Sequence, residues 1–97
     1  MKFLIEKKKL DDLVNHLNTE KFEVEVQALL TPVSLEVKII KYGTSTLLFE
    51  IEPQPKGKLL AVELIKEKLS WLHKSKKQMI QTLVNDMVTK AGGTVQV

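Results

Sequence analysis

Three stretches of the chain, residues 22–28, 35–39 and 47–52, alternate between apolar and mainly polar side chains. Such alternation is typical of a strand with one face on a core and the other in water. The breaks between them, at Thr31-Pro32 and at residues 42–45, are short, and short connections make successive strands antiparallel neighbours. The sequence therefore predicts a three-stranded antiparallel meander. The side chains expected on its core face are Phe22, Val24, Val26, Leu35, Val37, Ile39, Leu47, Phe49 and Ile51.

The residues before the meander predict one short strand and one short helix. Phe3 and Ile5 point to one side and Leu4 to the other, so we expect a strand to open the chain. Apolar residues then recur at intervals of three and four, which is the spacing of a helix with one apolar stripe. They are Leu10, Leu13, Val14 and Leu17.

The residues after the meander are expected to be helical. Residues 52–57 contain two prolines and predict a loop that is neither a central strand nor a helix interior. Between residues 58 and 90, nine apolar side chains from Val62 to Met87 fall in one helical stripe, but a straight helix of that length, roughly 50 Å, exceeds a compact domain of this size. Either the helix breaks near residues 73–77, which we favour because charge interrupts the stripe there, or it overhangs and a second subunit covers it.

These elements predict a single α+β domain over residues 1–97, in the order β-α-β-β-β-α(α). A strand, helix and meander occupy residues 1–57, and a long, bent or broken helical region occupies residues 58–91. Ala91-Gly92-Gly93 ends this region, and residues 92–97 form a tail or a short strand. The helices are expected to cover one face of the sheet and to leave the other in water.

The composition argues against an enzyme. The chain has no cysteine, which excludes thiolate catalysis and thiolate metal sites. Its two histidines, His16 and His73, lie in separate predicted helices without metal-ligand spacing, and no glycine-rich phosphate loop or nucleophile motif is present. We therefore expect no catalytic, cofactor-binding or metal-binding residues and no small-molecule substrate. No apolar run approaches the ~18 residues of a membrane span, and lysines follow the first six residues too closely for a signal peptide, so we expect a cytoplasmic protein.

An excess of apolar residues in the C-terminal region favours an interaction module. On a helix over residues 58–72, Leu60, Leu64 and Trp71 lie opposite the main stripe, and a helix that is apolar on both sides is covered on both sides. Tryptophan is favoured at the centres of interfaces, although Trp71 could equally fill a gap within one subunit. Our leading hypothesis is a non-enzymatic module that forms a homodimer. The expected contact residues are Leu60, Leu64, Trp71, Met79, Leu83 and Met87.

The lysine content supports an alternative hypothesis. Residues 1–57 hold 8 Lys and 9 acidic residues, whereas residues 58–97 hold 7 Lys and 3 acidic residues. Lysines neutralise phosphates without reading bases, so the alternative is sequence-independent binding of structured RNA, unless the lysines form an ordinary solvated face. The lysines concerned are Lys56, Lys58, Lys74, Lys76 and Lys77.

The expected element order adds to this alternative. The order of a helix, three antiparallel strands and a second helix is similar to that in double-stranded-RNA-binding domains, which place lysines at the start of the last helix. With the leading strand it is also similar to the order in ribosome-hibernation factors. The glycine-rich hairpin of the RNA-binding family and its consecutive lysines before an alanine-rich helix are absent here, so the similarity is one of order alone.

Overall fold

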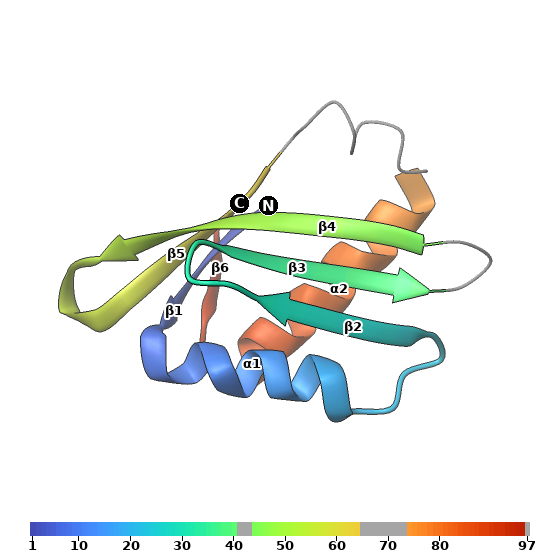
Figure 1. Ribbon diagram of the computed structural model, residues 1–97, viewed down its shortest axis with the longest axis horizontal. Helices are drawn as coiled ribbons and strands as arrows, with labels where there is room; N and C mark the ends of the chain where they lie inside the picture. The colour runs from blue at the N-terminus through green and yellow to red at the C-terminus, as the bar shows by residue number, and fades with distance from the viewer. Residues whose placement is uncertain (41–43, 65–73, 97) are drawn as a thin grey trace.

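A computed structural model describes residues 1–40, 44–64 and 74–96, and it confirms the α+β class. A six-stranded antiparallel sheet and two α-helices make up these residues (Figure 1). In chain order the elements are β1 (Lys2–Glu6), α1 (Lys7–Thr19), β2 (Glu25–Leu30), β3 (Ser34–Ile40), β4 (Thr44–Gln54), the 3-10 turn η1 (Pro55–Gly57), β5 (Lys58–Glu63), α2 (Lys74–Lys90) and β6 (Thr94–Gln96).

The strands lie side by side in the order β2-β3-β4-β5-β1-β6, with every neighbouring pair antiparallel. The predicted meander is therefore present as β2, β3 and β4, although β2 begins at Glu25 rather than at Phe22. The chain then continues the meander into β5 before β1 and β6 complete the sheet. A sheet of six strands thus stands where the sequence predicted four, with β6 as a possible fifth.

The helix predicted from residue 58 is wrong over residues 58–63, which form β5. This strand lies between β4 and β1, where Ala61 is opposite Ile51 on one side and opposite Phe3 on the other. A short apolar run such as Leu59–Val62 fits a buried strand and a helix equally well, so its spacing does not decide between them. Hydrogen bonds to the neighbouring strands β4 and β1 stabilise the strand conformation, and β1 is remote from β5 in sequence. The helical prediction for residues 65–73 lies outside the described residues.

The loop predicted over residues 52–57 is also shorter than expected, because β4 runs through Pro53 to Gln54. The Ile51 N–H donates to the Val33 carbonyl at 2.9 Å, so the amide side of Ile51 faces β3. Alternation along the strand turns the Pro53 nitrogen to the same side, beyond the end of β3. Proline has no N–H to donate, and here none is needed, which is why it is tolerated.

The core lies between one face of the sheet and the two helices. Leu10, Leu13 and Leu17 of α1 are buried against it, and Ile80, Val84 and Val88 of α2 are fully buried. Phe3 and Phe49 are fully buried in this core, with their ring centroids 5.2 Å apart in an edge-to-face arrangement. Figure 1 shows α2 crossing behind β2, β3 and β4, with α1 alongside β2.

The end of α2 agrees with the prediction from Gly92 and Gly93. The Gly93 N–H donates to the Val88 carbonyl and the Gly92 N–H to the Thr89 carbonyl, the two hydrogen bonds of a Schellman motif. Gly92 has a φ of +85°, which glycine adopts without steric cost. The turn leads directly into β6.

Candidate interaction site

The exposed positions of α2 between residues 78 and 89 carry almost no charge. Between residues 78 and 89, Asp86 is the single charged side chain among the exposed positions. Those positions are Gln78, Met79, Thr82, Asn85, Asp86 and Thr89. The exposed positions of α1, in contrast, include Lys7, Lys8, Lys9, Asp11 and Asp12. Depletion of charge, together with an exposed methionine, is the composition that distinguishes the centre of a protein–protein interface from ordinary surface.

A hollow of about 470 Å³, which we call the Met79 groove, lies on one side of this face. Met79, a large apolar side chain, is 42% exposed. The residues lining the groove come from α2, from β3 and from the segment before β2. They are Phe22, Glu23, Val24, Ile39, Gln78, Met79, Thr82, Leu83 and Asp86.

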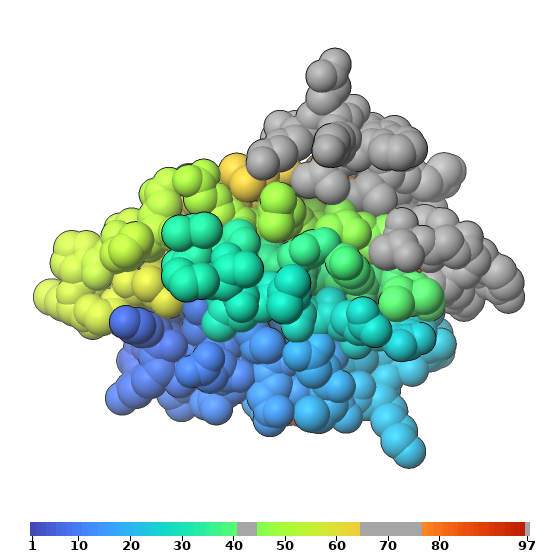
Figure 2. Space-filling model, in the orientation of Figure 1, coloured from blue at the N-terminus to red at the C-terminus, as the bar shows by residue number. Residues whose placement is uncertain are grey.

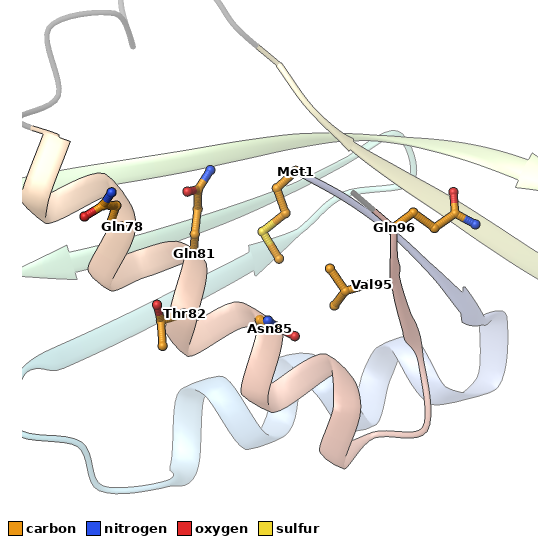
Figure 3. Close-up of a pocket in the computed structure, with 7 residues that line it drawn as sticks. All are labelled: Met1, Gln78, Gln81, Thr82, Asn85, Val95 and Gln96. Carbon is orange, nitrogen blue, oxygen red and sulfur yellow. The ribbon is translucent and has the colours of Figure 1, made fainter.

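A second hollow of about 570 Å³, which we call the amide groove, lies on the other side of the same face, between α2 and β6. Its lining residues are Met1, Gln78, Gln81, Thr82, Asn85, Val95 and Gln96. Figure 3 shows Met1 and Val95 in the space between the helix and the strand. Carboxamide and hydroxyl groups dominate its polar lining, and they both donate and accept hydrogen bonds without carrying charge.

Gln78 and Thr82 line both hollows. They lie four residues apart on α2 and therefore form a ridge along the helix, with one groove on each side. Helices pack by placing such a ridge into the groove of a neighbour. The exposed face of α2 between residues 78 and 89 thus carries a ridge with a hollow on each side.

A buried carboxylate fixes α2 on the sheet. The Glu63 side chain, 5% exposed, lies at the end of β5 on the core face. The Met1 ammonium donates to its Oε2 at 3.0 Å, Gln81 Nε2 donates to Oε2 at 2.9 Å, and Lys77 Nζ lies 2.9 Å from Oε1. Burial raises the pKa of Glu63, but the hydrogen bonds from these donors outweigh it and hold the pKa below its ordinary value. Sequence reasoning missed this cluster, because residue 63 was assigned to a helix.

A second polar contact ties the other end of α2 to α1. Lys90 forms an ion pair with Glu20, whose carboxylate also lies 3.7 Å from the His16 ring nitrogen. The hydrogen bond from Lys90 lowers the pKa of Glu20. Polar contacts therefore hold α2 at Lys77 and Gln81 in its first half and at Lys90 at its end.

The structure does not bring the six predicted interface residues together. Met79 and Leu83 line the Met79 groove, whereas Met87 is 8% exposed and belongs to the core. Leu60 and Leu64 alternate with Ala61 and Glu63, so they lie on the sheet face opposite the helices. Figure 2 shows part of that face, where β2, β3 and β4 form the surface. Trp71 lies outside the described residues.

The predicted lysine cluster is also divided. Lys56 and Lys58 lie in and beside the turn between β4 and β5, at the opposite end of the view in Figure 1 from the start of α2. Lys77 is paired with Glu63, and the side chains of Lys74 and Lys76 lie outside the described part of the chain. Lys56 instead shares a hollow with Lys7 and Lys8. No single surface of the described residues carries the lysines that the alternative hypothesis named.

The remaining findings concern metal ligands, membrane-spanning helices and similar proteins. The described residues contain no group of three or more metal-ligating side chains. Within the same ranges, no helix has the length and apolar character that crossing a membrane requires. A scan against protein-family models and searches of curated proteins and solved structures found no match.

Proposed function

We propose that this chain is a small non-enzymatic interaction module that forms a homodimer through the exposed face of α2. The observation that carries the proposal is the uncharged ridge of Gln78 and Thr82 between the two grooves. A two-fold dimer uses the same patch on both subunits, so the patch must complement itself. A ridge flanked by grooves meets this requirement, because the ridge of each copy enters a groove of the other.

The opposite face of the sheet is less suited to this role. Its half-buried apolar side chains, among them Leu60 and Leu64, share the face with charged residues. Lys38 and Glu36 form an ion pair there at 3.4 Å, and Glu50 and Glu52 are exposed. Burying these charges would require partners for them, whereas the ridge and its two grooves contain two carboxylates, those of Glu23 and Asp86 in the Met79 groove.

Sedimentation equilibrium at micromolar concentrations, with a charge placed on the ridge, tests the proposal. We expect the wild-type chain to be a dimer and Thr82→Lys to weaken association by roughly tenfold or more, because the longer side chain would no longer fit the groove that receives the ridge and its ammonium would lose water on association. Thr82 is exposed on the surface of the single chain, so the fold should tolerate the change. Asn15→Lys, which places the same charge on the exposed face of α1, is the matched control and should leave the dimer intact.

Two results would contradict the proposal. One is a wild-type chain that sediments as a monomer throughout the concentration range. The other is a dimer that Thr82→Lys leaves unchanged, since the shared surface would then lie elsewhere. Circular dichroism of both variants establishes that they are folded.

A further inference from the structure

The two edge strands of the sheet, β2 and β6, differ in what lies against their outer backbone groups. At the β2 edge, the Asn18 side chain of α1 pairs with the backbone of Ala28: its Nδ2 donates to the Ala28 carbonyl at 3.0 Å, and the Ala28 N–H donates to Oδ1 at 2.6 Å. At Ala28, a side-chain amide thus occupies the place that a further strand would take. Proteins commonly block edge strands in this way to prevent unwanted pairing.

The β6 edge has no such block among the described residues. The Glu63 N–H donates to the Met1 carbonyl, so Met1 and Phe3 turn their backbone groups toward β5, while Lys2 and Leu4 turn theirs toward β6. Lys2 and Leu4 are opposite Gln96 and Thr94, which therefore bond to β1. Alternation leaves the N–H and C=O of Val95 directed away from the sheet.

We infer that two copies of this chain join their sheets by antiparallel pairing of β6 with β6 of the second copy, centred on Val95. This inference rests on the proposed function, and it names how the two α2 faces are brought into register. A two-fold axis through the Val95 pair would place both helices on the same side of a continuous twelve-stranded sheet, that is, twice the six strands of one copy.

The lining of the amide groove supports this geometry. Val95 and Gln96 of β6 line the same hollow as the ridge residues Gln78 and Thr82, so the strand edge and the helix ridge belong to one surface. A second copy seated on the edge would cover the hollow, where Gln81 and Asn85 offer hydrogen-bonding groups without charge. β6 has only three residues, so the Val95 pair supplies two backbone hydrogen bonds that fix orientation, and the helix faces supply most of the buried area.

Hydrogen exchange of the Val95 amide in the intact chain tests the inference directly. We expect the Val95 N–H to be protected in the wild-type dimer and to exchange about tenfold faster or more in the Thr82→Lys monomer, while the Phe3 amide, which faces β5, stays protected in both. Val95→Pro removes the N–H and should weaken the dimer by roughly tenfold. Val95→Ala removes apolar side-chain atoms but keeps the N–H, and it should weaken the dimer much less.

The outcomes separate the two proposals. If Thr82→Lys dissociates the dimer while the Val95 amide exchanges equally fast in dimer and monomer, the helix interface stands and the strand pairing is wrong. If Val95→Pro and Val95→Ala weaken the dimer equally, the pairing is also wrong. A wild-type monomer would remove both proposals.

Discussion

At the scale of single residues, Glu63 is the clearest case of a charge whose role depends on its neighbours. Its carboxylate lies on the core face and is neutralised by Lys77 and the Met1 ammonium, with Gln81 as a third donor. These donors join β5, the start of β1 and the first half of α2. Removing the carboxylate would leave two cationic groups without the anion between them, which is more costly than losing the pair as a whole.

We predict that Glu63→Gln lowers the free energy of unfolding by about 2 kcal/mol at pH 7, measured by urea denaturation. The folded pKa of Glu63 lies below its ordinary 4.5, so its contribution is complete above that value and is lost as the pH falls through the folded pKa. The gap between wild type and variant should therefore narrow below about pH 4.5. A gap that stays constant from pH 7 to pH 3 would contradict this account. Glu52→Gln, an exposed carboxylate on the other sheet face, is the control.

Asn18 acts at the same scale by completing the β2 edge. We predict that Asn18→Ala costs about 1–2 kcal/mol, because both hydrogen bonds to Ala28 are lost, and that the Ala28 amide exchanges faster. Asn15→Ala makes the same change at an exposed position of α1 and so controls for the higher helix propensity of alanine. Equal effects of the two substitutions on stability and on Ala28 exchange would show that the edge contact contributes nothing.

At the scale of elements, the turn from α2 into β6 depends on close packing at Gly93. A Cβ atom there would lie 2.8 Å from Val88 Cγ1 and 3.0 Å from the Leu4 carbonyl oxygen, so either the turn or β1 would have to move. The contact with Leu4 matters most, because Leu4 is the residue that pairs with Thr94. The glycine therefore sets how near β6 approaches β1.

We predict that Gly93→Ala destabilises the fold by about 1–3 kcal/mol and that the Thr94 and Gln96 amides exchange faster than in wild type. Gly57→Ala is the matched control, since a Cβ at Gly57 meets nothing within 4 Å and only its φ of +71° opposes alanine. It should cost about 1 kcal/mol and leave exchange in β6 unchanged. Unchanged exchange at Thr94 and Gln96 in Gly93→Ala would contradict this prediction.

At the scale of the whole molecule, the apolar surplus noted in the sequence is distributed differently from the prediction. The sequence placed Leu60, Leu64 and Met79 on one helical region, whereas in the structure Leu60 lies in β5, Leu64 directly follows β5, and Met79 lies in α2 on the opposite face of the sheet. Forming β5 brings Leu59 and Ala61 to the core face and turns Leu60 to the other. The face of α2 that remains exposed is therefore defined by how the sheet is completed rather than by the pattern of α2 alone.

The amino-acid pattern by itself determined the α+β class, the β2–β4 meander, α1, and the end of α2 at Gly92. Alternation, helical spacing and glycine act over a few residues, and that range is enough to select a local conformation. Only the tertiary structure decided that residues 58–63 form a strand, that Glu63 meets Lys77 and the N-terminus, and that Asn18 pairs with Ala28 at one edge of the sheet. These features arise from groups far apart in the chain, whose mutual distances no local pattern specifies.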